Sequence, residues 1–150
     1  MDEANARETL TGLRGVHVAI GPVVEEAQQH GVSEAQIRTD VELQLRQAGI
    51  VALKKDDLRR APGMPLLYVW AAVAPAKGTS SGYAYHVQVE VLQLIVLTRN
   101  PDVFSLARTW NAKGGLGAVG ADGLAKTVKE AVHGMTEQFV TAFLAANPKR

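Results

Sequence analysis

The chain has 150 residues, a common size for a single domain that buries a core without disulfides or structural metals. Its hydrophobic fraction of 47% and charged fraction of 21% exclude a disordered or fibrous class, and its net charge of +1 argues against a dedicated nucleic-acid-binding protein. Cysteine is absent, which removes disulfides, thiolate metal sites and a cysteine nucleophile.

The N-terminus is polar and acidic rather than basic and then apolar, which is not the pattern of a signal peptide. We expect residues 1–12 to form a flexible segment and residues 13–150 to form a single α+β domain. The longest apolar stretches, Leu66–Ala74 and Val91–Leu97, are about half of the roughly 20 residues that a membrane helix requires. No transmembrane segment is therefore expected.

The domain opens with a βαβ-like pattern. Apolar residues alternate over 16–20 and predict a strand, after which 22–31 is expected to be an ordered loop. Ser33–Gln36 has the form of a capping box and predicts a helix over 34–48. A short apolar run at 50–53 predicts the next strand.

The middle of the chain is rich in strand formers. Residues 54–60 mix Lys, Arg and Asp, and this pattern is typical of a solvated turn rather than of a phosphate-binding track. Leu66–Ala74 predicts a second long strand, and Gly78–Gly82 predicts a flexible connection.

The strand that starts at Tyr83 has a distinctive pattern. One face is apolar and the other is polar until the alternation slips near Val91-Leu92, which predicts a β-bulge or a sharp bend. Leu92–Leu97 is then apolar on both sides, so both sides need a cover. Either the loops at 22–31 and 54–65 or a second chain supplies it.

The last third predicts a turn at Asn100–Asp102, a strand at Ser105–Ala112 and a final helix. Asp122 is the expected cap of that helix, whose apolar stripe contains Phe139 and Phe143. The predicted fold is therefore α+β, with a single mainly antiparallel sheet of about five strands, a βαβ-like start and two helices packed on one face.

Two short motifs have the form of catalytic or cofactor-binding sequences. Gly115–Gly120 matches G-x-G-x-x-G, but no further strand follows the helix, so we interpret it as a flexible crossover whose glycines allow close packing. Gly78–Gly82 matches G-x-S-x-G, but it lies between two strands, where a hydrolase nucleophile at Ser80 is not expected. No cofactor and no catalytic residue are assigned.

The four histidines show no metal-binding spacing, so no metal site is expected. His17, His86 and Glu90 fall in phase on the sheet face that the helices leave open. Polar residues on a wet face are the ordinary explanation. A small hydrolase or ligand-binding enzyme with a site around these three residues is the alternative.

Aromatic residues make up only 5% of the chain, so a cluster of them on the open face would indicate a binding surface. The candidate binding face consists of Tyr68, Trp70, His86, Gln88, Glu90 and Trp110.

Several short segments resemble small uncharacterised bacterial proteins that are usually exported: Leu13–Val16, Ser33–Ile50, Tyr83–Tyr85, Thr109-Trp110, Gly117–Gly120 and Asn147–Lys149. The element order is also similar to the α/β domain of the TolB amino-terminal domain and of the curli secretion lipoprotein family. This resemblance implies a periplasmic or secreted module that binds envelope partners, although a cytoplasmic location is the alternative. The lipobox cysteine of the lipoprotein members is missing, which leaves membrane anchoring unsupported.

The leading hypothesis is thus a non-enzymatic binding or assembly module of the bacterial cell envelope that acts through a sheet face or edge. Its expected partner is another protein or a second copy of the chain, and no nucleic acid.

Overall fold

The computed structural model describes residues 3–76 and 82–149. Within these ranges the strands form one six-stranded, mostly antiparallel sheet, which confirms the predicted α+β class. The strands are β1 (Gly15–Ile20), β2 (Val51–Ala52), β3 (Leu66–Pro75), β4 (Gly82–Leu97), β5 (Asn100–Asn111) and β6 (Leu116–Gly120). The helices are α1 (Glu3–Glu8), α2 (Glu25–Gln29), α3 (Glu34–Gln47), α4 (Lys55–Leu58) and α5 (Leu124–Ala146), preceded by the 3₁₀ turn η1 (Ala121–Gly123).

The strand order is β2-β1-β3-β4-β5, and β6 also pairs with β4. β1 runs parallel to β2 and β3, as expected for a βαβ-like start, and every other pairing is antiparallel. β5 and β6 share one edge of β4: β6 pairs with its first part, Gly82–His86, and β5 pairs with Glu90–Leu97.

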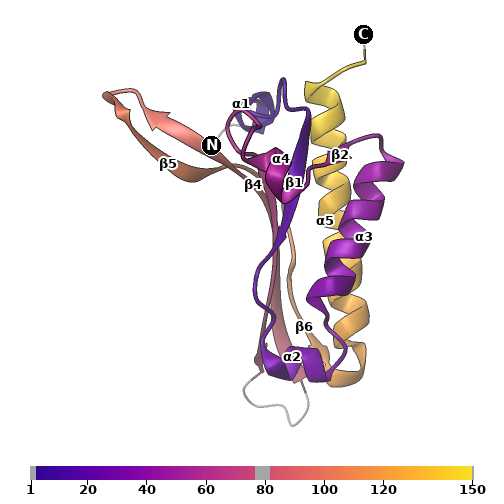
Figure 1. Cartoon of the computed structure of the whole chain (residues 1–150). Helices are drawn as coiled ribbons and strands as arrows, with labels where there is room; N and C mark the ends of the chain where they lie inside the picture. The colour runs from indigo at the N-terminus through magenta and orange to yellow at the C-terminus, as the bar shows by residue number, and fades with distance from the viewer. Residues whose placement is uncertain (1–2, 77–81, 150) are drawn as a thin grey trace.

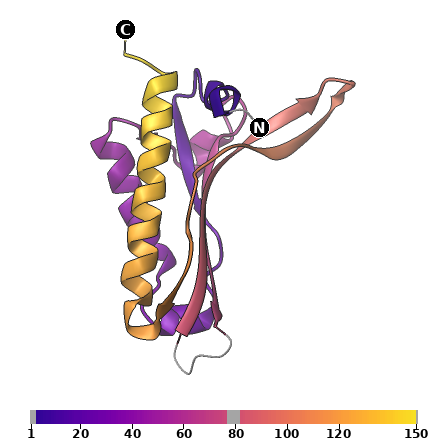
Figure 2. The ribbon, with the colours of Figure 1, turned by 180° about the vertical axis from the view of Figure 1, so that it is seen from behind.

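α3 and α5 lie side by side on one face of the sheet and leave the other face without a long helix (Figures 1 and 2). The predicted cap of α3 is confirmed, because Ser33 Oγ accepts a hydrogen bond from the Gln36 amide at 3.3 Å. α5 buries an apolar stripe in which Phe139 is fully buried and Phe143 is 7% exposed. These side chains meet the inward-facing valines of β1, β3 and β4 in one core.

Residues 3–12 have defined structure, whereas residues 1–12 were expected to form a flexible segment. Residues 3–8 form α1, and Leu10 is fully buried in the core. Asn147, just after α5, donates from Nδ2 to the Leu10 carbonyl at 2.9 Å and accepts from the Gly12 amide at 2.7 Å. Tertiary contacts therefore fix this segment, which has no apolar periodicity of its own.

Two expected loops contain helices. The 22–31 region contains α2, which Tyr83 fastens to the sheet by donating a hydrogen bond to Glu26 Oε1 at 2.8 Å. His30 Nε2 lies 3.1 Å from the same hydroxyl. The 54–60 region contains α4, a single helical turn whose charged residues are exposed, as the solvated-turn prediction requires.

Three boundaries in the last third differ from the prediction. Gly115–Gly120 is mostly strand β6 rather than a loop. The chain turns at Thr98-Arg99, so Asn100 already belongs to β5. Asp122 lies in η1 and does not cap α5, whose N-cap is Gly123 without a side-chain hydrogen bond.

The predicted irregularity near Val91-Leu92 is confirmed by a register shift between β4 and β5 at this point. Beyond it the two strands leave the body of the sheet as a projecting ribbon, which we call the arm and define as residues 93–108 (Figure 1). The predicted loop cover is absent on much of the arm, because Val96 is 58% exposed and Leu94 is 40% exposed. At the base of the arm, the Leu94 amide donates to the Gly63 carbonyl at 2.7 Å and Gln93 Nε2 donates to the Thr9 carbonyl at 3.1 Å.

Candidate functional site

The arm carries an apolar face built from two cross-strand pairs. Leu94 lies opposite Leu106, and Val96 lies opposite Phe104. These four side chains, which we call the arm face, are 40%, 46%, 58% and 65% exposed, respectively. Scattered exposed hydrophobic residues are normal on a protein surface, but paired ones on a projecting ribbon form a patch of the kind that marks interfaces.

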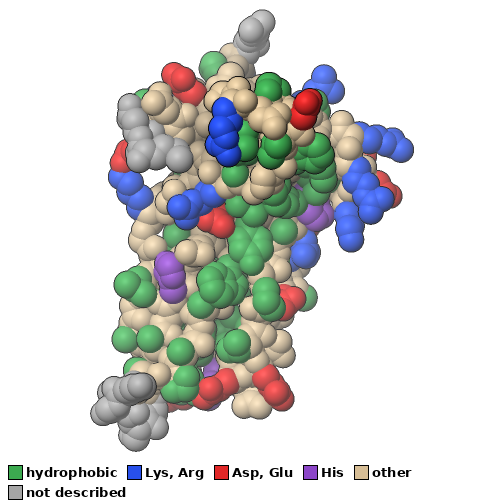
Figure 3. Space-filling view, turned by 90° about the vertical axis from the view of Figure 1, so that its left-hand side faces the viewer, with side chains coloured by type: hydrophobic (Ala, Val, Ile, Leu, Met, Phe, Trp, Pro, Cys, Tyr) green, Lys and Arg blue, Asp and Glu red, His purple; other side chains and the backbone are tan. Residues whose placement is uncertain are grey.

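The arm face continues the open face of the sheet. The extra residue at the bulge is Thr109 on β5, since Val91 pairs with Trp110 and Leu92 with Arg108. β4 therefore keeps its alternation, and Leu94 points to the same side as Leu92. Figure 3 shows the result as a band of hydrophobic side chains that runs from the arm onto the open sheet face.

The outer edge of β5 is not paired with another described strand. The Leu94 amide bonds to Gly63, on the side away from β5, so the Leu94–Leu106 pair is a non-hydrogen-bonded one. By the alternation of antiparallel pairs, Phe104 and Leu106 direct their amides and carbonyls away from β4, whereas Ser105 bonds inward. Among the described strands none pairs with β5 on its outer side. This edge is a template for another strand.

The two aromatic residues of β3 lie on the open face, where the sequence predicted them. Tyr68 and Trp70 are half-buried and pack over Gly21, at which a Cβ would lie 2.5 Å from the Tyr68 hydroxyl and 2.6 Å from Trp70 Cδ1. The prediction that Trp110 belongs to this face is wrong. Trp110 is 8% exposed and packs edge-on against Phe139 of α5, because it pairs with the inward-facing Val91.

The polar members of the candidate face gather around a small hollow of about 290 Å³ where β5 leaves β4. His86, Gln88 and Glu90 line it from β4, with Arg108 from β5. The Arg108 guanidinium lies 3.4 Å from the Glu90 carboxylate, so the two charges partly neutralise each other. The hollow brings three of the predicted residues together, and Tyr68 and Trp70 lie beside two of them as the cross-strand partners of Glu90 and Gln88.

His17 is not part of that hollow. It lies on β1 beside Leu66, and its Nδ1 is 2.7 Å from the Leu53 carbonyl. β3 separates β1 from the strand that carries His86 and Glu90. The three residues of the enzyme alternative therefore do not share a pocket, and their arrangement offers no nucleophile with an adjacent base.

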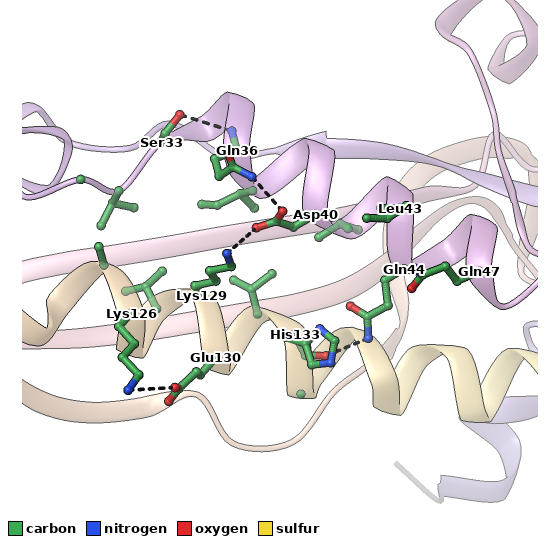
Figure 4. A pocket seen from close by; sticks show the side chains of 18 residues that line it. Ser33, Gln36, Asp40, Leu43, Gln44, Gln47, Lys126, Lys129, Glu130 and His133 are labelled. Carbon is green, nitrogen blue, oxygen red and sulfur yellow. Dashed lines mark hydrogen bonds and ion pairs between the residues drawn. The ribbon is translucent and has the colours of Figure 1, made fainter.

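A larger groove of about 670 Å³ runs between α3 and α5 (Figure 4). Its polar side chains bind one another: Lys129 lies 3.8 Å from Asp40, Lys126 lies 3.9 Å from Glu130, and Gln44 donates to the His133 carbonyl at 3.1 Å. Its floor is the apolar packing of the two helices. The groove is thus a helix-packing seam in which no catalytic set of side chains converges.

The glycine motif has a structural role. A Cβ at Gly115 would lie 2.2 Å from the Val87 carbonyl oxygen, and one at Gly117 would lie 2.4 Å from the Tyr85 hydroxyl. The predicted close packing is confirmed at Gly115, just before β6, and at Gly117, which lies within this strand rather than in a crossover loop. The Gly78–Gly82 motif with Ser80 lies almost entirely outside the described residues. Over residues 3–76 and 82–149 there is no group of three or more His, Asp or Glu that would hold a metal ion.

The sequence analysis identified half of the arm and missed the rest. Leu92–Leu97 drew attention because its polar alternation is lost. Leu106 falls in the predicted strand Ser105–Ala112, and Phe104 falls between this strand and the predicted turn, so neither was predicted to complete an apolar surface. The available signal was the uncharged run Val103–Ala107, a length and composition typical of a strand that pairs with another chain.

The chain matches no protein-family model, no curated protein and no solved structure. No helix in the described ranges has the length and apolar character needed to cross a membrane.

Proposed function

We propose that this chain is a non-enzymatic binding or assembly module that acts through the arm. The observation that carries the proposal is the exposure of the arm face, on which Phe104 is 65% exposed. An isolated two-stranded ribbon is marginally stable in water, and a partner that covers or extends it would stabilise it. Exposed aromatic and aliphatic residues are also the usual anchors of protein interfaces.

The enzyme alternative around His17, His86 and Glu90 has less support. Those three side chains lie on two strands separated by β3, and the hollow beside β4 includes only the last two. The Glu90 carboxylate is already close to a guanidinium, which favours a charge-paired surface over a general base.

A photo-crosslinking residue at position 104, introduced at native expression level in the native host, tests the proposal. The matched control is position 51 on β2, at the opposite edge of the sheet, where Val51 is 55% exposed. We expect discrete crosslinked species from position 104 and none from position 51. Equal labelling at both positions, or none from the arm, would contradict an arm-directed binding function.

We also propose a periplasmic or secreted location, on the strength of the resemblance to exported envelope proteins. Fractionation of the native host tests it separately. Recovery of the chain in the cytosolic fraction would overturn the location and leave the arm proposal standing.

A further inference from the structure

We infer that the partner of the arm is a second copy of this chain, joined by two-fold antiparallel pairing of β5 with β5 about Ser105. The inference rests on the proposed function, because it assumes that the arm is the binding surface. Identical strands pair in this way around a two-fold axis, which is the commonest symmetry of soluble oligomers. The outer edge of β5 pairs with no other described strand, so a second copy of β5 can pair there.

The directions of the backbone amides and carbonyls of β5 fit this register. Phe104 and Leu106 direct their amides and carbonyls outward, as the Leu94–Gly63 hydrogen bond requires. With Ser105 on the axis, Phe104 of each copy faces Leu106 of the other as a hydrogen-bonded pair. The two Ser105 residues then face each other as a non-hydrogen-bonded pair, which agrees with the inward direction of their own amides.

Charge complementarity selects the same register. Counting outward from Ser105 brings Asp102 of each copy toward Arg108 of the other, and between these residues β5 has no charged side chain. Asp102 lies in the irregular stretch of β5 between Asn100 and Phe104, which pair with the neighbouring residues Leu97 and Val96. Asp102 is exposed, and the Arg108 side chain is 55% exposed beside Glu90, so a second carboxylate can approach it. A shift of the register by two residues would separate both ion pairs.

The pairing also converts two marginal ribbons into a four-stranded sheet. Phe104 of one copy and Leu106 of the other then lie on the same side as direct cross-strand neighbours, and such apolar pairs stabilise a sheet by roughly 0.2–1 kcal/mol each. Three or more strands with an apolar face exceed the minimum for an independently stable sheet. Pro101 and the bulge at Thr109 bound the free segment, which limits pairing to this short stretch.

Disulfide trapping tests the register, because the chain has no cysteine of its own. Two cysteines at a non-hydrogen-bonded pair have Cα atoms about 4.5 Å apart, within the range a disulfide spans. We expect Ser105→Cys to form a covalent dimer under mild oxidation. The matched control is Ala107→Cys on the same strand and side, whose two copies would lie about 14 Å apart along the strands and should crosslink at least about tenfold more slowly. Equal rates, or no dimer from Ser105→Cys, would overturn the register.

Charge reversal gives a second readout without oxidation. Asp102→Arg and Arg108→Asp should each weaken the dimer in analytical ultracentrifugation, and the double variant should restore it because both ion pairs are rebuilt with opposite polarity. A double variant as weak as the single ones would contradict the pairing. If all variants and the parent chain remain monomeric while position 104 still crosslinks to another protein, self-pairing is wrong and the binding function stands. If position 104 gives no crosslink either, the binding function itself fails.

Discussion

Leu94 and Leu106 face each other across the arm, each with nearly half of its surface in water. They form a non-hydrogen-bonded pair, so their backbones direct hydrogen-bonding groups toward the two outer edges of the ribbon. The amide of Leu94 finds the Gly63 carbonyl on one side. Leu106 has no described strand on the other side, and this asymmetry is the reason why we propose that a partner adds at the β5 edge.

Alanine substitutions at Phe139 and Phe104 should have very different effects on the free energy of unfolding. Phe139→Ala removes a fully buried ring that contacts Trp110 and Phe143, and we expect it to cost about 3–5 kcal/mol. Phe104→Ala removes a 65% exposed ring and should change monomer stability by less than about 0.5 kcal/mol. Urea denaturation at low protein concentration measures both. A small loss for Phe139→Ala would mean that α5 does not form the core described above.

Gly115, just before β6, and Gly120, at the end of β6, should differ sharply in how well they tolerate alanine. Gly115→Ala places a Cβ against the Val87 carbonyl at a φ of +88°, so we expect a loss of several kcal/mol. Gly120→Ala is the control, because its Cβ would meet nothing within 4 Å. Thermal melts of the two variants give the comparison. Similar melting temperatures would show that β6 does not pack against β4 as described.

The same motif should not bind nucleotides. A ligand present at about 100 times its dissociation constant would stabilise the folded state by about 2.7 kcal/mol. We expect no change in melting temperature with NAD or ATP, since Leu116–Gly120 is paired with β4 as a strand rather than forming a loop in front of α5. A rise of several degrees would contradict this assignment.

The contact of Tyr83 with Glu26 predicts a pH effect. The Glu26 carboxylate accepts the Tyr83 hydroxyl hydrogen bond, and this bond, together with burial and the negative charge, raises the pKa of Tyr83 above 10.0. The folded chain therefore holds the phenolic proton more tightly than the unfolded chain. Its contribution to stability is fully present below the unfolded pKa and is lost as the pH rises through the folded pKa.

Tyr83→Phe removes both the proton and the hydrogen bond, so the stability of this variant should fall less steeply above about pH 10 than that of the parent chain. Chemical denaturation at a series of pH values provides the measurement. Parallel pH profiles for the two proteins would show that the Tyr83–Glu26 contact does not persist in solution.

Local patterns predicted much of this fold. The Ser33 cap, the long strand from Tyr83 and the apolar stripe of α5 are each encoded within a few consecutive residues, and each is found in the structure. The slip at Val91-Leu92 also predicted where the register between β4 and β5 shifts, although the extra residue lies on β5 at Thr109 and β4 keeps its alternation.

The missed elements depend on distant partners. α1 is held by Leu10 and Asn147, which lie at opposite ends of the chain, and β6 exists because β4 offers it an edge. Trp110 was placed on the wrong face because the extra residue at Thr109 shifts the alternation of β5. The local sequence pattern does not show which of two paired strands contains the extra residue of a bulge.

Amide hydrogen exchange resolved at single residues of β5 tests directly whether a second chain pairs with the outer edge of this strand. Ser105 bonds inward to β4, so its amide should be protected at every protein concentration, whereas the outward amides of Phe104 and Leu106 should become protected only as the protein associates. We expect protection that depends on protein concentration and is confined to the amides of Phe104 and Leu106. Rapid exchange of Phe104 and Leu106 under conditions where a dimer is populated would contradict it, because the β5 edge would then remain open to water.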